Sequence, residues 1–307
     1  MREAGSGAVS SAGALALGGA TRLTAVFGDP VEHSLSPAMH NAAYAALGLD
    51  RAYVAFRVGA AMLPAAVRAI PALGIAGVNL TVPHKERAAR MVAQLSAEAR
   101  MLGAINCIVS RSGRLYGDNT DARGLERDLD ALGVALAGRL AIVVGAGGAA
   151  RAAALACLRC GAGQVVVANR TLARAAAMVR RFRARRPRAL GRASLGARGL
   201  EALNDASLLG RAALIINATP MGLTSAGFAP VNYALTPGHC FFYDLIYAME
   251  PTAFLRPAME LGRRCADGAS MLVNQGELAF ELFNGVAPPS GVMRRALWER
   301  LGRPPNS

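Results

Sequence analysis

Short apolar runs alternate along the chain with longer stretches in which apolar residues recur at helical spacing. The runs LTAVFG, AYVAFRV and AGVNLTV are rich in β-branched and aromatic residues, which is typical of strands buried in a sheet. Each run is followed by a stretch whose apolar positions repeat about every three or four residues, as on one face of a helix. Strands that alternate with helices predict βαβ units and therefore an α/β fold built on parallel sheets.

The alternation falls into two series. In the first, GAINCIVS and GRLYGDN predict a hairpin, and we expect Asp121 to cap the helix that follows it. The second series begins with the strand LAIVV at 140–144. The remaining predicted strands lie at 23–28, 52–58, 76–82, 164–169, 213–219 and 240–246. The predicted helices lie at 37–48, 63–73, 121–133, 271–283 and 292–302, with an Ala- and Arg-rich helix after Pro83.

Composition limits the class of protein. The chain has 307 residues, of which 53% are hydrophobic and 18% charged, so a large core is expected and global disorder is excluded. The net charge of +14 indicates anionic partners such as phosphates, carboxylates or nucleic acid. No apolar run reaches about 18 residues, so no membrane span is predicted. Five cysteines are an odd number, which argues against a disulfide framework and favours a reducing cytoplasm.

The first 22 residues are rich in Gly, Ser and Ala. A signal peptide is one interpretation, because Arg2 precedes an apolar patch. Glu3 offsets that charge, however, and ALAL is too short for the apolar region of such a peptide. We therefore expect residues 1–22 to be a disordered leader or the product of an early start codon.

Two short motifs allow more than one interpretation. Cys157 and Cys160 have the spacing of a redox pair or half a zinc site, but no second such pair accompanies them, and we expect packed helix residues. The run RRFRARRPR at 180–188 resembles a nucleic-acid patch, although Phe182 is its only aromatic residue. We expect it to form a solvated helix end and loop that helps to steer an anionic cofactor. The histidines show no metal-ligand spacing, so no metal is predicted; they are His33, His40, His84 and His239.

A glycine-rich turn follows the strand LAIVV. Gly145-x-Gly147-x-x-Ala150 stands between this strand and a helix, which is the context of a dinucleotide-binding turn. Gly145 permits the tight turn, Gly147 lets the backbone approach a pyrophosphate, and Ala150 allows close helix–strand packing. The helix N-terminus supplies unpaired N–H groups for the phosphates. The residues predicted to hold the cofactor at this turn are Gly145, Ala146, Gly147, Gly148 and Ala149.

The end of the next strand predicts which dinucleotide is bound. NAD-binding domains usually place Asp or Glu there, bonded to the ribose 2′-hydroxyl. This chain has Asn169, Arg170 and Thr171, with Arg174 one turn later, and no Asp or Glu between residues 131 and 200. Two guanidinium groups and a hydroxyl suit a 2′-phosphate, so the predicted cofactor is NADP(H).

Lys85, in the stretch VNLTVPHKE, is the only lysine in the chain, and the other 33 of the 34 Lys and Arg residues are arginine. Arginine stays charged, whereas lysine can release a proton. Biased codon usage explains many arginines but not the exception. The lone lysine therefore indicates proton transfer, with chance survival on the surface as the alternative.

Several motifs together resemble the shikimate/quinate dehydrogenase family over nearly all of residues 23–301. The matching stretches are VFGDPVEHSLSPAMHN, GVNLTVPHK, GAINCIV, GDNTDARG, VVGAGGAARA, NRT, NATPMG, YDLIY and GASMLVNQGELAF. The resemblance implies a two-lobed fold in which a Rossmann-type NADP domain, 122–266, is inserted into a substrate domain. The substrate domain would comprise 23–121 and, through C-terminal helices that return to it, 267–307.

The resemblance also implies the roles of individual residues. Lys85 and Asp121 would be the catalytic pair. In the motif HSLSP, Ser36 is a plausible N-cap before Pro37, and the family uses the positions of Ser34 and Ser36 to hold the substrate carboxylate. The positions implied around the substrate are Ser34, Ser36, Thr81, Lys85, Asn106, Asp121, Tyr247 and Gln275. Positions implied along the cofactor are Thr219, Met221, Leu245, Gly268 and Met271.

Other interpretations of these residues remain. Asn and Asp are common turn and cap residues, and Met or Tyr is often simply core. The implied activity is NADPH-dependent reduction of 3-dehydroshikimate to shikimate, in a monomer or homodimer without a nucleic-acid or membrane partner. An NAD-using quinate/shikimate dehydrogenase is the close alternative, and a non-catalytic NADP or metabolite sensor on the same fold is the alternative from another class.

Overall fold

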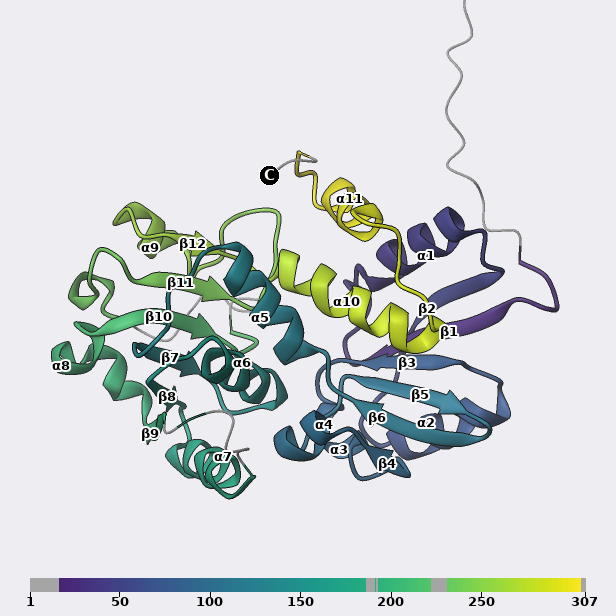
Figure 1. Cartoon of the computed structure of the whole chain (residues 1–307), viewed down its shortest axis with the longest axis horizontal. Coiled ribbons are helices and arrows are strands. Elements are labelled where there is room, and N and C mark those ends of the chain that lie inside the picture. The colour runs from purple at the N-terminus through teal and green to yellow at the C-terminus, as the bar shows by residue number, and fades with distance from the viewer. Residues whose placement is uncertain (1–16, 186–190, 192, 222–230, 305–307) are drawn as a thin grey trace, which may run out of the picture.

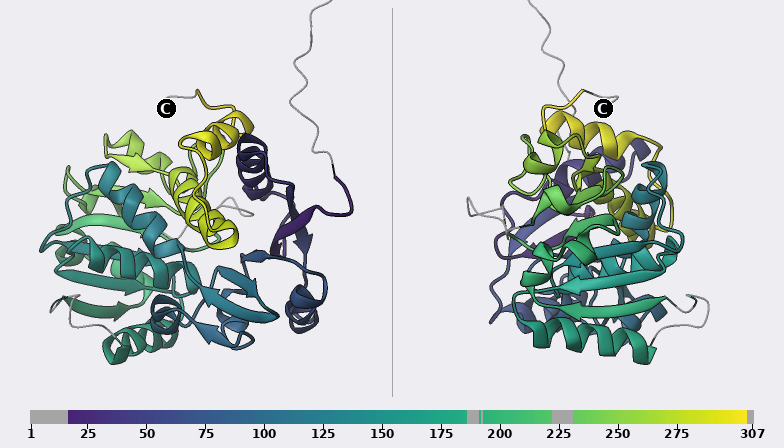
Figure 2. Two further views of the ribbon diagram at one scale, coloured as in Figure 1. Left: turned by 45° about the vertical axis from the view of Figure 1, so that its right-hand side comes forward. Right: turned by 90° about the vertical axis from the view of Figure 1, so that its left-hand side faces the viewer.

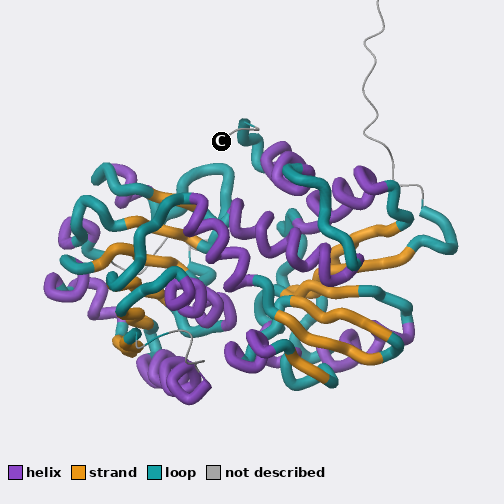
Figure 3. The backbone as a smooth tube through the Cα atoms, viewed as in Figure 1, coloured by secondary structure: helices purple, strands orange, loops and turns teal. Residues whose placement is uncertain are grey.

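The strands of the protein form two separate six-stranded sheets, each covered by helices, and the sheets give the molecule two lobes (Figure 1 and Figure 3). The computed structural model describes residues 17–185, 191, 193–221 and 231–304. The two-lobed α/β fold predicted from the sequence is confirmed.

The first sheet has the strand order β2-β1-β3-β5-β6-β4. Its strands are β1 (Arg22–Gly28), β2 (Arg51–Arg57), β3 (Gly77–Leu80), β4 (Gln94–Leu95), β5 (Cys107–Arg111) and β6 (Arg114–Asp118). The predicted hairpin is present as β5 and β6, which pair antiparallel, as do β3 and β5. The first sheet is therefore mixed: β1 pairs parallel with β2 and β3, as the alternation of strands and helices predicts, and the hairpin adds antiparallel pairs.

Helices cover both faces of the first sheet. They are α1 (Ser36–Leu47), α2 (Leu63–Ala72), α3 (Lys85–Ala88) and α4 (Ala97–Leu102). Successive residues of β1 point to opposite faces, as the strand period requires. Val26 packs with Met39 of α1, whereas Phe27 packs with Leu63 of α2.

The second sheet has the order β12-β11-β10-β7-β8-β9, and all its neighbouring strands are parallel. Its strands are β7 (Leu140–Val144), β8 (Gln164–Ala168), β9 (Ser194–Arg198), β10 (Ala212–Asn217), β11 (Phe241–Asp244) and β12 (Cys265–Ala266). The sequence did not predict β9 or β12, because these edge strands lack a run of apolar residues. The helices of this lobe are α6 (Gly148–Arg159), α7 (Leu172–Arg185), α8 (Ala206–Leu209) and α9 (Arg256–Glu260), with short 3-10 helices at Leu200–Asn204 and Tyr233–Leu235.

Two long helices lie side by side between the lobes, α5 (Asp121–Ala131) and α10 (Ala269–Asn284) (Figure 1). The last helix, α11 (Val292–Arg300), packs against α1, so the C-terminal helices return to the first lobe as predicted (Figure 2). The crossing of α5 and α10 is close because Gly124 has no side chain. A Cβ at Gly124 would lie 2.7 Å from the Cβ of Gln275 and 2.9 Å from its backbone nitrogen.

The predicted leader ends earlier than expected, because Arg22 already belongs to β1. Thr21 also donates a hydrogen bond to Asp50, with 2.6 Å between Oγ1 and Oδ1. Residues 1–16 of that leader lie outside the described part of the chain. Within the described part, no helix has the length and apolar character needed to cross a membrane.

Candidate active site

A buried polar cluster forms where α3, β5 and α5 meet. Lys85 Nζ lies 2.5 Å from Asp121 Oδ2, with side chains that are 18% and 5% exposed. The other carboxylate oxygen of Asp121 accepts a hydrogen bond of 2.8 Å from the Asn106 amide. Within the described part of the chain the Lys85 ammonium bonds to Asp121 alone, and the bond from Asn106 fixes the orientation of that carboxylate. The structure thus brings the two predicted catalytic residues together.

The fourth member of the cluster comes from the far end of the chain. Gln275, on α10, accepts a hydrogen bond of 3.1 Å from Asn106 Nδ2. The close approach of α10 at Gly124 is what allows this contact. Thr120 also accepts from Asn106, at 2.8 Å, and its backbone N–H donates to Asn106 Oδ1 at 2.8 Å. Amide, carboxylate and ammonium groups are therefore concentrated in one place, which suits a ligand rich in hydroxyl groups.

The start of α5 differs from the prediction. Asp121 does not cap this helix but is its first residue, and its carboxylate points to Lys85 and Asn106 instead. The backbone N–H of Asp121 donates to the side chain of Asn119 at 3.0 Å. Asn119 thus satisfies one backbone N–H group at the start of α5.

The start of α1 also differs from the prediction. Leu35, and not Ser36, is the N-cap residue, and Ser36 is the first helical residue. The Ser36 N–H points to Ser34 Oγ at 3.4 Å, so both serines still lie at the helix N-terminus. Tyr247 packs against the same core cluster as Leu35 of this turn, and burial raises the pKa of Tyr247. Ser34 and Ser36 therefore lie together at the start of α1, and Tyr247 lies near this turn.

A second row of buried polar groups connects this turn to the lysine cluster. The Tyr53 hydroxyl donates to Asn79 at 2.7 Å, and Asn79 donates to the backbone oxygen of Asn106 at 3.2 Å. The Tyr53 hydroxyl also interacts with Ser36. The sequence analysis missed Asn79 and Tyr53. An amide in a four-residue strand that is otherwise apolar was the available signal for Asn79.

Thr81 follows β3 directly. The strand ends at Leu80, so Lys85 starts α3 and does not lie in the strand. The Thr81 carbonyl accepts the N–H of His84, which turns the chain toward Lys85. The Lys85 carbonyl accepts the N–H of Ile105 at 2.9 Å. These backbone bonds hold Lys85 next to Asn106, the residue that precedes β5.

The predicted dinucleotide turn has the expected geometry. Gly145 has φ of 118°, a conformation that side chains rarely permit, and a Cβ there would lie 2.9 Å from the Ala218 oxygen. Gly147 is the N-cap of α6, and no atom lies within 4 Å of the position of its absent Cβ. Ala146 is buried, Ala149 is partly exposed, and Ala150 is fully buried against the sheet. The open space beside Gly147, at the N-terminus of a 12-residue helix, suits a pyrophosphate.

The residues predicted to bind the 2′-phosphate follow β8. Arg170, Thr171 and Arg174 are exposed at the start of α7. No ion pair between either arginine and a described residue is present, so both guanidinium groups can meet an anion. Asn169 Nδ2 donates to the Thr171 oxygen at 2.9 Å and shapes the turn. The residues present fit an NADP phosphate.

The remaining predicted cofactor residues surround the ends of β10 and β11. Thr219 donates to Asn217 Oδ1 at 2.7 Å and accepts the N–H of Met221 at 3.3 Å. Leu245 follows β11, and Gly268 and the mostly buried Met271 lie at the start of α10. Beneath them Asn217 donates to Asp244 at 2.9 Å, and burial raises the pKa of Asp244 to about 6. The sequence analysis assigned neither Asn217 nor Asp244 to the site.

The two ambiguous motifs have structural explanations. Cys157 is buried within α6 and Cys160 is its C-cap, as expected for packed helix residues, and burial raises the pKa of both thiols. The described part of the arginine run forms the end of α7, where Arg180, Arg183 and Arg185 are exposed, as expected for a solvated helix end. Arg181 and Arg185 donate to the Arg100 oxygen, at 3.0 and 2.7 Å, at the end of α4. Residues 186–190 of the region lie outside the described chain.

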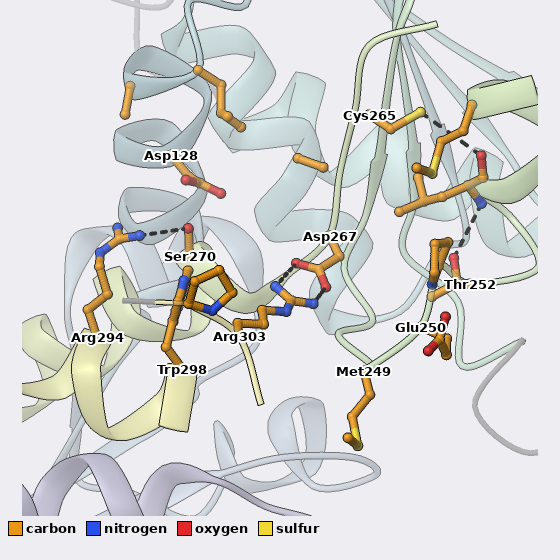
Figure 4. A pocket seen from close by; sticks show the side chains of 17 residues that line it. Asp128, Met249, Glu250, Thr252, Cys265, Asp267, Ser270, Arg294, Trp298 and Arg303 are labelled. Atoms are coloured by element: carbon orange, nitrogen blue, oxygen red, sulfur yellow. Dashed lines mark hydrogen bonds and ion pairs between the residues drawn. The ribbon is translucent and has the colours of Figure 1, made fainter. Parts of the chain in front are cut away.

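A pocket of about 560 Å³ lies apart from the cluster of Lys85, Asp121, Asn106 and Gln275, between α5, α11 and the loop after β11. None of the predicted site residues lines it. Its polar groups bond to one another: Arg303 pairs with Asp267, and Arg294 donates to Ser270 at 3.2 Å (Figure 4). We therefore do not include this pocket in the candidate site around Lys85 and Asp121.

The two-lobed fold, the dinucleotide turn at Gly145 and the pair of Lys85 and Asp121 place this chain among the α/β dehydrogenases that use a nicotinamide dinucleotide. Residues 26–108 match the shikimate dehydrogenase substrate binding domain, residues 129–197 match the shikimate / quinate 5-dehydrogenase family, and residues 268–297 match the shikimate 5'-dehydrogenase C-terminal domain. A shikimate dehydrogenase (NADP(+)) from Geobacter sp. (strain M21) is 39% identical over 289 residues, which are 94% of this chain and 98% of the relative. The chain belongs to the shikimate dehydrogenase family.

Solved structures agree with this assignment. A shikimate dehydrogenase in complex with NADP+ has a TM-score of 0.83 and 32% identity, covering 93% of this chain and 97% of its own. The Thermus thermophilus enzyme in complex with NADP(H) and shikimate has a TM-score of 0.78 and 38% identity, covering 92% and 100%. A quinate dehydrogenase from Corynebacterium glutamicum in complex with NAD has a TM-score of 0.80 but only 28% identity, covering 91% and 99%.

Proposed function

We propose that this protein catalyses the reversible, NADPH-dependent reduction of 3-dehydroshikimate to shikimate. The observation that carries the proposal is the contact of Lys85 with Asp121, in a cluster with Asn106 and Gln275, beside a dinucleotide turn. We assign residues 23–121 and 267–307 to the substrate domain and 122–266 to the NADP domain.

In this proposal the Lys85 ammonium gives a proton to the substrate oxygen during reduction and its amine takes one during oxidation. The bound dinucleotide supplies the hydride for reduction and accepts it in the reverse direction. Asp121 holds the ammonium in place, because its carboxylate is itself oriented by Asn106.

The substrate would be held at both ends. Ser34 and Ser36 would bind its carboxylate at the N-terminus of α1, with Tyr247 beside them. Thr81, Asn106 and Gln275 would bind its ring hydroxyls. The exposed Arg170 and Arg174, with Asn169 and Thr171, would bind the 2′-phosphate of NADP. Thr219, Met221, Leu245, Gly268 and Met271 would line the nicotinamide end.

One assay tests the activity directly. Purified protein is given shikimate or quinate, each with NADP+ or NAD+. We expect the highest kcat/KM for shikimate with NADP+. A preference for quinate with NAD+ would favour the alternative represented by the Corynebacterium enzyme, and binding without turnover would favour a sensor.

We further propose that the protein acts in the cytoplasm as a monomer or homodimer. All five cysteines are free thiols, as a reducing compartment allows. Light scattering would give the oligomeric state, and a larger assembly would contradict this expectation.

A further inference from the structure

The proposed proton donor rests on the dinucleotide turn of the other lobe. A Cβ added to Gly148, the first residue of α6, would lie 3.3 Å from the Cβ of Lys85 and 3.6 Å from its Cδ. The same position lies 3.5 Å from the Cβ of Ala104. The aliphatic part of Lys85 thus packs on a glycine whose neighbours are expected to bind the pyrophosphate.

One arginine of α6 connects the dinucleotide turn to the segments around Lys85. Arg151, three residues after Gly148, forms an ion pair of 2.6 Å with Glu86, the residue next to Lys85. Its other terminal nitrogen donates to the backbone oxygens of Leu102 and Gly103, at 3.1 and 3.3 Å. The Arg151 side chain is 15% exposed, whereas Glu86 is 40% exposed.

These contacts involve the residues next to the Lys85 backbone. Glu86 follows it in α3, and Ile105, two residues after Gly103, donates to the Lys85 carbonyl at 2.9 Å. Arg151 therefore bonds both to the residue that follows Lys85 and to the segment that leads to Ile105, the backbone partner of Lys85. Lysine has a flexible stem of four carbons, so its ammonium position depends on how its backbone and stem are held.

We propose that Arg151 is a positioning residue that couples the dinucleotide turn to Lys85. Binding of the dinucleotide at the start of α6 is transmitted through Arg151 to Glu86 and the end of α4, which fixes Lys85 against Gly148. The inference rests on the proton-transfer role proposed for Lys85.

The alternative is that Arg151 only clamps the two lobes. The chain offers a matched control, because Arg159 lies on the same helix and also crosses between the lobes. Arg159 pairs with Glu98 of α4 at 2.8 Å and with Glu126 at 3.6 Å, and these partners do not adjoin Lys85. Removal of Arg159 takes away an arginine and a cross-lobe ion pair but leaves the support of Lys85 intact.

Kinetics separate the two explanations. We expect Arg151→Ala to lower kcat by roughly 10–100-fold, because a small displacement of a reacting group has an effect of this size. The shikimate KM should change much less, and Arg151→Lys should recover part of kcat. Arg159→Ala should leave kcat within about twofold of the unmodified protein, because its partners Glu98 and Glu126 do not adjoin Lys85, whose position sets kcat in this proposal. Glu86→Gln, which keeps the side-chain shape, should reproduce part of the loss if Arg151→Ala folds poorly.

The reactivity of Lys85 gives a readout independent of activity. Since Lys85 is the only lysine, an amine-selective reagent labels only this residue and the N-terminus, and peptide mass spectrometry reports the labelling rate. We expect NADP+ to slow the labelling of Lys85 in the unmodified protein and in Arg159→Ala. Arg151→Ala should lose most of this protection at NADP+ concentrations that calorimetry shows to be saturating.

Equal kcat and equal protection in Arg151→Ala and Arg159→Ala would overturn the inference. The proton-transfer role of Lys85, on which the inference rests, fails by a different result, which is normal turnover in Lys85→Arg. If Arg151→Ala then still lost the NADP+ protection of Lys85 from labelling, the coupling between the dinucleotide turn and Lys85 would stand without the proton-transfer role. The failure of the coupling and the failure of the proton-transfer role are therefore distinguishable.

Discussion

Lys85 and Asp121 form an ion pair of 2.5 Å between side chains that are 18% and 5% exposed, and they come from α3 and α5, which precede and follow the hairpin β5–β6 in the chain. The carboxylate keeps a positive charge in a mostly buried place, where it would otherwise be costly. Asn106 orients that carboxylate through its second oxygen. The pair therefore presents one ammonium group in one direction, which is what directed proton transfer requires.

The first prediction concerns Lys85 itself. Lys85→Ala and Lys85→Arg should each lower kcat by roughly 10²–10⁴, the usual contribution of a general acid or base, with a smaller change in the shikimate KM. Arginine keeps the charge but does not release a proton. Steady-state kinetics in both directions measure the effect, and near-normal turnover in Lys85→Arg would rule out proton transfer by this residue.

The second prediction concerns cofactor choice. Arg170→Ala should raise the NADP+ KM by tens-fold, because a charge-assisted hydrogen bond contributes about 1.5–3 kcal/mol. The poor use of NAD+ should hardly change, since NAD+ lacks the phosphate. Arg68→Ala is the control, because this arginine is also exposed but lies on α2 of the other lobe. An equal loss with both cofactors would mean that Arg170 serves the fold.

The third prediction concerns the turn at the start of α1. Ser34→Ala and Ser36→Ala should mainly raise the shikimate KM, because a carboxylate remote from the reacting carbon is bound alike in ground and transition states. The NADP+ KM, measured in the same assays, should stay constant and acts as the internal control. A fall in kcat alone would show that these hydroxyls do not bind the carboxylate.

The fourth prediction concerns acid stability. His40 is 1% exposed, stacks on Tyr53 with ring centroids 4.1 Å apart, and burial lowers its pKa from 6.5 to about 3. Below pH 6.5 the unfolded chain therefore gains a proton at His40 that the folded chain does not take up until about pH 3. The contribution of His40 to stability is consequently lost as the pH falls through this range.

We compare the protein with His40→Leu, which removes the titration and has a similar volume. Between pH 7 and pH 5 the free energy of unfolding of the unmodified protein should fall by about 2 kcal/mol relative to the variant. Urea unfolding at the two pH values measures this difference. Asp244, whose raised pKa acts in the opposite sense, is present in both proteins and cancels. Parallel changes in the two proteins would contradict a neutral buried His40.

The features predictable from the sequence are those that depend on neighbours in the chain. The alternation of strands and helices, the dinucleotide turn with its Gly145, and the exposed arginines after β8 all follow from local spacing and backbone geometry. Lys85 could be selected because its chemistry differs from that of every arginine around it. The family resemblance then assigned roles to residues that spacing alone could not rank.

Tertiary packing decided the rest. Asn106 and Gln275 stand 169 positions apart, and they meet only because Gly124 lets α10 approach α5. No local pattern shows that Arg151 reaches Glu86, the residue beside Lys85. Local sequence determines which elements form, because their hydrogen bonds and periodicity are short-range. Which side chains meet between those elements depends on close packing across the whole chain, and that is decided only when the two lobes come together.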